Sequence, residues 1–401
     1  MIKICIIGLG YVGLPLALTF SRKFETIGFD NNNARIKNLK NKIDNNSEFS
    51  KKDFYNKNIN FTSKIEEIKN CNYYIICVPT PVDKKNNPDL SPLKKAFNFL
   101  QKLIKVGDTV VLESTVYPGI TNHFGDFLQK KTNLIKNKDF FMCYSPERIN
   151  PGDNTKELHK INKIFSTEIK NKNKINEIKK IYKLASKKII FSKKIEEAEA
   201  AKVIENIQRD LNIALFNEIL MICDKLKINF NQVIKLAATK WNFINFKPGL
   251  VGGHCLPVDP YYLAHISRKK KLKIITTLSG RKTNSYMKDF VLKKFNEFTK
   301  KKYIKLNQKI LIIGLTYKYG VADMRNSLNF QIFKKIQKKY PHTKGFDPFI
   351  KNQKNIIQSK DISKYDLFVF LSDGNKYKSI FNKLKKVKKN IIDPFCYYTN
   401  K

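Results

Sequence analysis

The first 30 residues carry the feature that most restricts the fold of this chain. A short apolar run at residues 2–7 leads into the glycine motif GLGYVG at residues 8–13, and an apolar helical pattern follows. In such a unit Gly8 permits the tight turn, Gly10 lets a pyrophosphate approach, and Gly13 brings the helix against the strand. The sequence therefore predicts a Rossmann-like dinucleotide-binding unit, with phosphates at the helix N-terminus.

An acidic residue completes this unit. Asp30 closes a second strand-like run that begins at Thr26, about 20 residues after the glycine motif. A carboxylate there accepts a hydrogen bond from the ribose 2′-hydroxyl and repels a 2′-phosphate. The motif therefore favours NAD over NADP as the cofactor.

Polar residues follow two further predicted strands. Residues 73–78 and 109–112 are mostly apolar, and Thr80 and the pair Ser114-Thr115 come shortly after them. Ligands of a doubly wound sheet bind at the carboxyl ends of its strands. These hydroxyls are therefore candidate ligand contacts, and ordinary strand-end hydrogen bonds are the alternative.

A second glycine-rich segment, VGGHCLPVD at residues 251–259, contains a nucleophile. Its glycines let the backbone approach a ligand closely, Cys255 supplies a thiol, and Asp259 lies near enough in sequence to handle a proton or a water. A thiol combined with a nicotinamide indicates oxidation through a covalent intermediate. The alternative is a buried, unreactive cysteine in a glycine loop.

The stretch from Ile195 to about Lys225 contains no glycine and predicts one long helix. Lys202 and Asn206 lie at positions i and i+4, so they share a face of this helix. An ammonium and an amide placed in this way can converge on one oxygen and stabilise an oxyanion. The alternative is a solvated lysine beside a surface asparagine.

A second α/β pattern begins near Lys309, with strands expected near residues 343–346, 367–371 and 390–392. It lacks the glycine fingerprint, so we expect it to bind the nucleotide of a substrate. The predicted fold class is α/β, with two Rossmann-like doubly wound domains joined by a long central helix and a helical middle domain. The predicted domains are 1–194, 195–299 and 300–401.

Composition restricts the class of partner. The formal net charge is +43, but the lysines are spread along every segment and the aromatic residues have core spacing, which favours solvated faces over a nucleic-acid surface. We expect no specific nucleic-acid partner, although such a surface attracts an anionic small substrate. The seven cysteines form no CxxC pair, which predicts no disulfide framework, no metal site and a reduced cytoplasm. No signal peptide and no membrane span are expected.

Seven sequence blocks, in this order, resemble the UDP-glucose/GDP-mannose dehydrogenase family. The blocks are GLGYVGLPLA (8–17), CVPTPVD (77–83), ESTVYPG (113–119), YSPERINPGD (144–153), AEAAKVIENIQRDLNIALFNE (198–218), GLVGGHCLPVDPYYL (249–263) and GLTYK (314–318). The fourth and sixth are most similar to the branch that oxidises UDP-N-acetylglucosamine or UDP-N-acetylgalactosamine for surface polysaccharides. UDP-glucose and GDP-mannose are alternative substrates for the same mechanism, and a non-catalytic nucleotide-binding regulator is a remote alternative.

The resemblance implies a four-electron oxidation of a sugar C6 alcohol to a carboxylate with two successive NAD molecules. A thiohemiacetal and then a thioester would form on the cysteine, so that no reactive aldehyde is released. The residues implied are Cys255 as nucleophile, Lys202 and Asn206 for the oxyanions, and Asp259, Glu147 and Thr115 for the water.

The resemblance also implies the ligand contacts and the roles of the three domains. The NAD contacts are Gly8, Gly10, Tyr11, Val12, Gly13, Asp30, Arg35, Thr80 and Thr115. The UDP-sugar contacts are Glu147, Arg148, Lys202, Asn206, Gly249, Gly252, Gly253, Lys318, Arg325 and, from a neighbouring subunit of a homodimer, Arg281. Residues 1–194 would bind NAD, 195–299 would form the dimer core, and 300–401 would bind the UDP-sugar. His254 is expected to shape its loop rather than to act as the base.

The chain departs from the family pattern at two points. The usual Lys-Ile-Val-Ser-Gly block is Lys163-Ile-Phe-Ser-Thr167 here, and Pro151 stands where the UDP-glucose branch has a second glutamate. The lost glycine is expected to alter a turn. No catalytic base is therefore assigned to residue 151.

Overall fold

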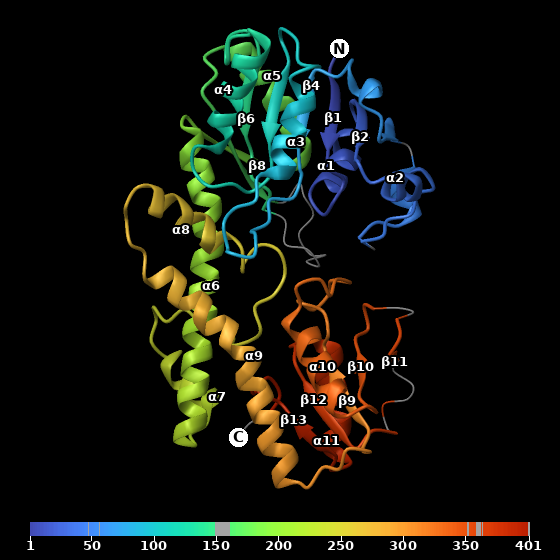
Figure 1. The fold of residues 1–401 in the computed structure, drawn as a ribbon, viewed down its shortest axis with the longest axis vertical. Coiled ribbons are helices and arrows are strands. Elements are labelled where there is room, and N and C mark those ends of the chain that lie inside the picture. The colour runs from blue at the N-terminus through green and yellow to red at the C-terminus, as the bar shows by residue number, and fades with distance from the viewer. Residues whose placement is uncertain are drawn as a thin grey trace. The chain divides into compact units, whose positions relative to one another are not determined.

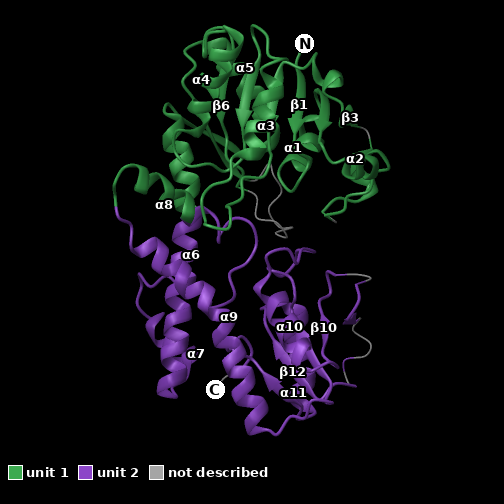
Figure 2. Cartoon of the chain, viewed as in Figure 1, with its two compact units in different colours: residues 1–205, 261–272 green, residues 206–260, 273–401 purple. Residues whose placement is uncertain are grey.

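The computed structural model describes residues 1–46, 48–55, 57–148, 161–350, 353–357, 362 and 364–399. Residues 149–153 of the YSPERINPGD block, including Pro151, lie outside the described residues. The chain divides into two compact units: residues 1–205 with 261–272 form unit 1, and residues 206–260 with 273–401 form unit 2 (Figure 2). The predicted domain boundaries at residues 194 and 299 stay a prediction.

Among the described residues, unit 1 contains a sheet of eight strands in the order β3-β2-β1-β4-β5-β6-β7-β8 (Figure 1). The strands are β1 Lys3–Ile7, β2 Glu25–Phe29, β3 Ile59–Thr62, β4 Tyr73–Ile76, β5 Thr109–Leu112, β6 Phe141–Tyr144, β7 Asn162–Thr167 and β8 Lys188–Ser192. Neighbours pair in parallel except β6 and β7, which are antiparallel. The strand order reverses between β1 and β4, and doubly wound sheets bind ligands at such a point.

The helices of unit 1 follow the strands in alternation. They are α1 Gly13–Phe20, α2 Asn33–Lys40, α3 Ser91–Leu100, α4 Ile120–Thr132 and α5 Lys172–Tyr182, with short 3-10 helices η1 Lys51–Phe54, η2 Ile65–Ile68 and η4 Lys183–Ala185. Every residue of α1 is buried, and β4, β5 and β6 are buried along their whole length. Strands covered on both faces are expected to be continuously apolar, which explains the apolar runs in the sequence.

Unit 2 combines long helices with a second, smaller sheet. Its helical part contains α7 Phe230–Ala237, α9 Thr276–Lys301 and the second part of α6 Ile195–Leu226, whose first part, 195–205, belongs to unit 1. Its described strands are β9 Ile310–Ile313, β10 Lys344–Phe346, β11 Ile356–Ile357, β12 Leu367–Phe370 and β13 Asn390–Ile392, all parallel in the order β11-β10-β9-β12-β13. Helices α10 Leu328–Lys339 and α11 Asn375–Lys386 complete this sheet domain, and α8 Asp259–Lys269 begins in unit 2 and continues in unit 1.

The predicted fold class is confirmed. The long helix predicted from Ile195 is α6, and the strands predicted near 343–346, 367–371 and 390–392 are β10, β12 and β13. Strands β7 and β8 were not predicted, because β8 is mostly exposed or half-buried and has no clear apolar alternation. Among the described helices, none has the length and apolar character needed to cross a membrane.

Candidate functional site

The glycine motif forms a narrow loop that is open at one point. Gly8 has φ +93°, and a Cβ atom there would lie 2.9 Å from the carbonyl oxygen of Cys77. A Cβ on Gly13, the first residue of α1, would lie 1.8 Å from the carbonyl oxygen of Gly8, whereas a Cβ on Gly10 would meet no atom within 4 Å. A side chain would therefore clash with the protein at Gly8 and Gly13, whereas there is free space beside Gly10. A backbone that binds a pyrophosphate needs such a space. These residues fit a dinucleotide.

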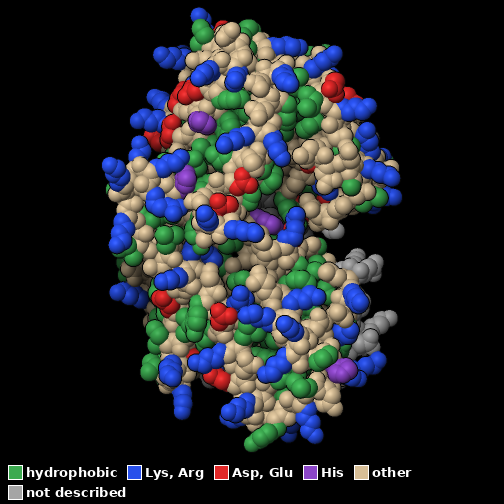
Figure 3. All heavy atoms as spheres, viewed as in Figure 1, with side chains coloured by type: hydrophobic (Ala, Val, Ile, Leu, Met, Phe, Trp, Pro, Cys, Tyr) green, Lys and Arg blue, Asp and Glu red, His purple; other side chains and the backbone are tan. Residues whose placement is uncertain are grey.

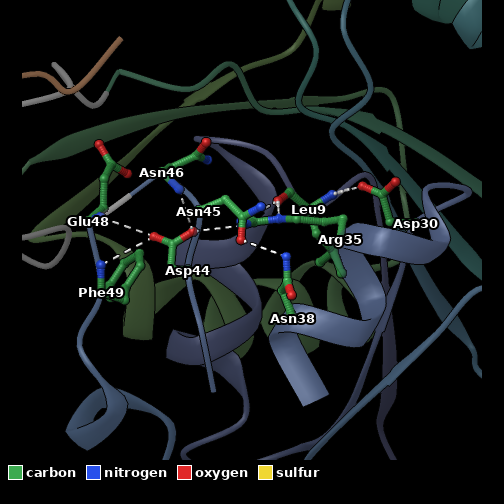
Figure 4. A network of polar contacts seen from close by, with 9 residues as sticks. All are labelled: Leu9, Asp30, Arg35, Asn38, Asp44, Asn45, Asn46, Glu48 and Phe49. Carbon is green, nitrogen blue, oxygen red and sulfur yellow. Dashed lines mark hydrogen bonds and ion pairs between the residues drawn. The ribbon is translucent and has the colours of Figure 1, made fainter. Parts of the chain in front are cut away.

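Asp30 and Arg35 brace this loop from two sides (Figure 4). The two carboxylate oxygens of Asp30 accept from the backbone N–H groups of Leu9 and Asn32, each at 2.9 Å. Arg35 donates through Nε and Nη2 to the carbonyl oxygen of Leu9, and its Nη1 pairs with Asp44 at 2.8 Å. Each Asp30 oxygen has a further lone pair for a ribose hydroxyl. Arg35 holds the loop here, and its direct contact with NAD stays a prediction.

The hydroxyl groups at the ends of β4 and β5 connect these two strand ends. Thr80 Oγ1 donates to the carbonyl oxygen of Thr115 at 2.7 Å, and Ser114 Oγ donates to that of Val78 at 2.7 Å. The hydroxyl of Tyr262, on α8, donates to the carbonyl oxygen of Thr80. These are the strand-end hydrogen bonds considered as the alternative. They place Thr80 and Thr115 together at the carboxyl end of the sheet, beside its switch point.

Glu147 belongs to a buried cluster of charges in unit 1. Lys163 Nζ lies 2.7 Å from Glu113 Oε2 and 3.4 Å from Glu147 Oε2, and the Tyr182 hydroxyl donates to Glu113 Oε1 at 2.9 Å. The remaining Glu147 oxygen accepts from the backbone N–H of Arg148 at 2.6 Å. Burial raises the pKa of Glu113 to about 7, although Lys163 opposes the rise. The cluster joins the ends of β5 and β6 to β7 and α5.

Arg148 also makes contacts of its own within unit 1. Its Nη2 pairs with Glu205 Oε1 at 2.7 Å, and its Nη1 donates to the carbonyl oxygen of Asn162. Glu205 is three residues after Lys202 on α6, and Lys202 is half-buried. The predicted contact of Arg148 with the UDP-sugar stays a prediction.

The segment that carries the Cys255 thiol leads directly into helix α8. Cys255 is exposed, and its carbonyl oxygen accepts from the N–H groups of Val258 and Asp259 at 2.9 and 3.0 Å. Asp259 is 2% exposed and accepts from Nδ2 of Asn206 on α6. Lys202 lies one turn before Asn206 on the same helix, as expected for positions i and i+4. Unit 2 thus brings Cys255, Asp259 and Asn206 together, and Cys255 is not the buried cysteine of the alternative.

The glycines before Cys255 let this segment lie close to Tyr317 and Asn326 of unit 2. A Cβ on Gly252 would lie 2.6 Å from the carbonyl oxygen of Asn326, and a Cβ on Gly253, which has φ +88°, would lie 2.8 Å from the Tyr317 ring. Gly249 is held through its N–H and carbonyl oxygen by the side-chain amide of Asn217, at 2.8 and 3.0 Å. The glycines therefore permit a close approach of this segment to other parts of the protein, and their predicted approach to a ligand stays a prediction.

His254 lies beside Asp323 and Asn326, and its expected role in shaping the loop stays a prediction. Its Nε2 lies 3.7 Å from Asp323 Oδ2, and its Nδ1 lies 3.2 Å from the side-chain amide of Asn326. Arg325 donates to both oxygens of Asp323, through Nε at 3.0 Å and Nη2 at 2.7 Å. Although burial opposes it, hydrogen bonds from His254 and Arg325 hold the pKa of Asp323 well below its usual range. Lys318, half-buried, precedes this segment, and the substrate contacts of Lys318 and Arg325 stay predictions.

Arg281 forms a buried ion pair within its own chain. It lies on α9, is 5% exposed and pairs with the buried Asp210 of α6, which also accepts from the side-chain amide of Asn284. Reaching the substrate of a neighbouring subunit would require this ion pair to break. Breaking one partner away from a buried pair costs about 3–5 kcal/mol. The predicted contact of Arg281 with the substrate of a neighbouring subunit stays a prediction.

Sequence reasoning missed three buried polar residues that hold segments of the site. Lys163 and Asn217 are described above, and Glu199 on α6 accepts from the N–H groups of Gly119 and Thr121 and from the Thr121 hydroxyl. Burial raises the pKa of Glu199 to about 7, against these hydrogen bonds. Lys163 carried no local signal, because its strand β7 was not predicted. Glu199 and Asn217 carried none, because polar residues are ordinary on a helix.

Three family models match successive parts of the chain. They describe the NAD binding, central and UDP binding domains of the UDP-glucose/GDP-mannose dehydrogenase family and match residues 2–186, 196–286 and 311–400. The protein CapL of Staphylococcus aureus is 44% identical over 338 residues, which are 84% of this chain and 79% of CapL. A UDP-N-acetyl-D-glucosamine 6-dehydrogenase of Salmonella typhi is 40% identical over 390 residues, 94% of this chain and 91% of that protein. The solved structure of a UDP-D-ManNAc dehydrogenase from Pyrococcus horikoshii has a TM-score of 0.85 and 30% identity, covering 97% of this chain and 93% of that one.

Proposed function

The chain belongs to the UDP-glucose/GDP-mannose dehydrogenase family and is an NAD-dependent nucleotide-sugar 6-dehydrogenase, and we propose that it oxidises the C6 alcohol of a UDP-N-acetylhexosamine to the uronic acid. The observation that carries the mechanism is the exposed Cys255 on a fixed glycine segment, with Asp259 buried and bonded to Asn206. An accessible thiol on a rigid backbone is what a two-stage oxidation needs, because the thiol retains the aldehyde.

The NAD site is proposed at the carboxyl ends of β1 and β4. Gly10 leaves space for the pyrophosphate, and Asp30 accepts from the ribose. The remaining proposed contacts are Gly8, Tyr11, Val12, Gly13, Thr80 and Thr115. NAD, when bound, accepts a hydride from C6 in each of the two oxidations.

The covalent chemistry is proposed for Cys255. Its sulfur adds to the C6 aldehyde to give a thiohemiacetal, and loss of a hydride from C6 leaves a thioester. Lys202 and Asn206 donate hydrogen bonds to the oxyanions, and one good donor in such a position contributes roughly 3–4 kcal/mol. A nearby ammonium also favours the thiolate, the competent nucleophile.

Hydrolysis of the thioester completes the reaction. Asp259 and Glu147 are the proposed water-activating carboxylates, and Thr115 the proposed partner of the water. As the water oxygen bonds to the thioester carbonyl, a carboxylate takes a proton, the C–S bond breaks, and Cys255 leaves as thiolate with the uronate released.

The identity of the sugar is proposed from the relatives. The Salmonella typhi relative is named a UDP-N-acetyl-D-glucosamine 6-dehydrogenase, and the Pyrococcus horikoshii structure is named for UDP-D-ManNAc. Both names carry an N-acetylated sugar, which supports a UDP-N-acetylhexosamine, used for surface polysaccharides. UDP-glucose and GDP-mannose are the alternatives.

The substrate contacts proposed in unit 2 are Gly249, Gly252, Gly253, Lys318 and Arg325, with Asn206 at the reacting carbon. The UDP binding model matches residues 311–400, which supports a nucleotide at the second sheet. Figure 3 shows Lys and Arg side chains spread over the visible face rather than gathered on it, so general attraction of an anionic sugar nucleotide is the effect we propose for them. The absence of a specific nucleic-acid partner stays a prediction.

A homodimer is proposed from the exposed face of α6. Leu215, Ile222 and Leu226 are 50%, 57% and 62% exposed, and their spacing of seven and four residues puts them on one stripe. Trp241 and Ile244, which follow α7, are also exposed. Apolar surfaces of this kind mark interaction sites. Ile222→Glu should give a monomer by analytical ultracentrifugation, and an unchanged sedimentation coefficient would refute this interface.

A cytoplasmic location is also proposed.

The function is tested by counting NADH per sugar. With limiting UDP-sugar and excess NAD, two NADH should form per sugar, and an N-acetylated sugar should react best. Cys255→Ser should abolish the two-NADH stoichiometry, whereas Cys396→Ser, a matched change at a half-buried cysteine, should retain it.

Other outcomes of this experiment would overturn different parts of the proposal. A preference for UDP-glucose or GDP-mannose would overturn the proposed sugar and keep the mechanism. One NADH per sugar from the wild type, or full turnover by Cys255→Ala, would overturn the thioester. Sugar binding without any NADH would favour the non-catalytic regulator.

A further inference from the structure

The nucleophile segment, residues 248–255, is contacted by a part of unit 2 that the mechanism above does not use. The chain after β13 includes Tyr397, whose hydroxyl donates to the carbonyl oxygen of Pro248 at 2.9 Å. Pro248 begins the segment and Cys255 ends it. Tyr397 and the whole segment belong to unit 2, so this contact lies within one compact unit. The tyrosine is therefore a candidate support of the thiol.

The part of the chain that carries this tyrosine is anchored at several points. The carboxylate of Asp393 accepts from three consecutive backbone N–H groups, those of residues 397–399, at 3.1, 2.8 and 3.0 Å. The side-chain amide of Asn231, on α7, donates to the carbonyl oxygens of Cys396 and Thr399 at 2.9 and 3.1 Å. The tyrosine ring packs against the apolar core of unit 2. The tyrosine hydroxyl is therefore held independently of the nucleophile segment.

The glycine that follows Pro248 leaves room for this hydroxyl. A Cβ on Gly249 would lie 2.7 Å from Tyr397 Oη, and the next nearest atom would be a ring carbon of the same tyrosine at 4.0 Å. A carbon and an oxygen normally stay at least about 3.3 Å apart. Gly249 has no positive φ, so alanine is conformationally allowed there. The approach of Tyr397 is thus what requires glycine at this position.

The nucleophile segment is held at further points on its way to the thiol. Pro248 is buried, and a buried carbonyl oxygen that loses its hydrogen bond costs free energy. The side-chain amide of Asn217 binds both backbone polar groups of Gly249. The N–H of Gly253 donates to the carbonyl oxygen of Asn326 at 3.3 Å. The tyrosine contact is the first of this series, so a shift at Pro248 displaces the residues that lead to the thiol.

We propose that Tyr397 is a positioning residue that fixes the start of the nucleophile segment and so holds the Cys255 thiol where it attacks the C6 aldehyde. The proposal rests on the proposed role of Cys255 as nucleophile. Such an attack needs the reacting atoms within about 3–3.5 Å of each other, and a displacement of about 1 Å can cost a hundredfold in rate. Tyr397 acts through the backbone of the segment and not on the sugar.

The first experiment is steady-state kinetics on Tyr397→Phe, which removes one hydroxyl and keeps the ring. The kcat should fall by roughly 10- to 100-fold, whereas calorimetric titration should give the wild-type Kd for UDP, which lacks the sugar that meets the thiol. Amide hydrogen exchange should be faster at Gly249 and Gly253, whose N–H groups are bonded to Asn217 and Asn326. A tyrosine with a merely structural role would lower stability and leave kcat unchanged.

A second variant tests the same contact from the side of the segment. Gly249→Ala places its methyl group against the Tyr397 hydroxyl and should also lower kcat. In the double variant with Tyr397→Phe the nearest atom is the ring carbon at 4.0 Å, so the added methyl should cause no further loss. Additive losses would overturn the proposal, because only independent sites give additive effects.

A matched control separates this effect from general damage. Tyr340 is a buried tyrosine of the same apolar core, and its ring packs edge-on against Phe295. Tyr340→Phe should keep both kcat and the slow exchange at Gly249. The proposal is wrong if Tyr397→Phe keeps the wild-type kcat, or if its affinity for UDP falls in proportion to kcat. A wild-type enzyme that oxidises no UDP-sugar would instead overturn the proposed function, and hydrogen exchange in Tyr397→Phe would still decide whether the tyrosine fixes the segment.

Discussion

Two glycines of the same motif should respond in opposite ways to the addition of one methyl group. Gly13→Ala places a Cβ 1.8 Å from the carbonyl oxygen of Gly8, and Gly10→Ala places one where no protein atom lies within 4 Å. Neither glycine has a positive φ, so alanine is conformationally allowed at both positions. The comparison therefore isolates contact from backbone strain.

The magnitudes follow from these distances. A carbon and a carbonyl oxygen normally stay at least about 3.3 Å apart, so Gly13→Ala forces the start of α1 away from the loop. Overpacking of this kind costs about 1–3 kcal/mol, or more where backbone must move. Gly10→Ala should leave the free energy of unfolding unchanged or raise it by about 0.4–1 kcal/mol, because alanine restricts the unfolded chain. It should weaken NAD binding at least tenfold, about 1.4 kcal/mol, because the methyl occupies the phosphate space.

Urea unfolding without NAD, followed by circular dichroism, measures the first quantity, and calorimetric titration with NAD measures the second. The expected pattern is a destabilised Gly13→Ala and a stable Gly10→Ala that binds NAD poorly. Equal loss of stability in both variants would refute the steric reasoning. Wild-type NAD affinity in Gly10→Ala would refute the assignment of the open space to the pyrophosphate.

Three further variants test the buried polar groups. Burial raises the pKa of Glu199 from 4.5 to about 7 in the folded protein. The stability that its protonation contributes is therefore fully present below about pH 4.5 and is lost as the pH rises to about 7. Over this range the free energy of unfolding of the wild type should fall by roughly 3 kcal/mol more than that of Glu199→Gln, which thermal unfolding at a series of pH values measures. Arg35→Met leaves the buried Asp44 without its cation and should lower the free energy of unfolding by about 3–5 kcal/mol, and an unchanged urea midpoint would contradict this. Asn217→Ala removes both hydrogen bonds to Gly249 and should cost about 2–3 kcal/mol, with faster amide hydrogen exchange at that glycine as the diagnostic.

Sequence patterns predicted those parts of the candidate site whose residues lie close together in the sequence. The glycine motif, its helix and Asp30 lie within 30 residues, and the loop of Cys255 and Asp259 within nine. Backbone geometry in such segments follows from residue type, because glycine and the strand–helix alternation restrict the options. The α/β fold class followed from the same alternation.

Ion pairs between residues far apart in the sequence could not be predicted from local patterns. Lys163 and Glu113 are 50 residues apart and meet because β5, β6 and β7 are neighbours in the sheet, and apolar periodicity does not determine strand order. Arg281 and Asp210 are 71 residues apart on two helices. In a chain with 77 basic residues, nothing local distinguishes a buried arginine from an exposed one.

The discontinuity of unit 1 has a consequence for how the protein is made. Residues 261–272 belong to unit 1, although the chain first enters unit 2 at residue 206. The fully buried Tyr262 donates its hydroxyl hydrogen to the carbonyl of Thr80, so the NAD-binding unit lacks a core side chain until this segment has emerged from the ribosome. At about 5–20 residues per second, translation delays completion of the first unit by several seconds. The N-terminal unit therefore closes only after the nucleophile segment of unit 2 has been synthesised.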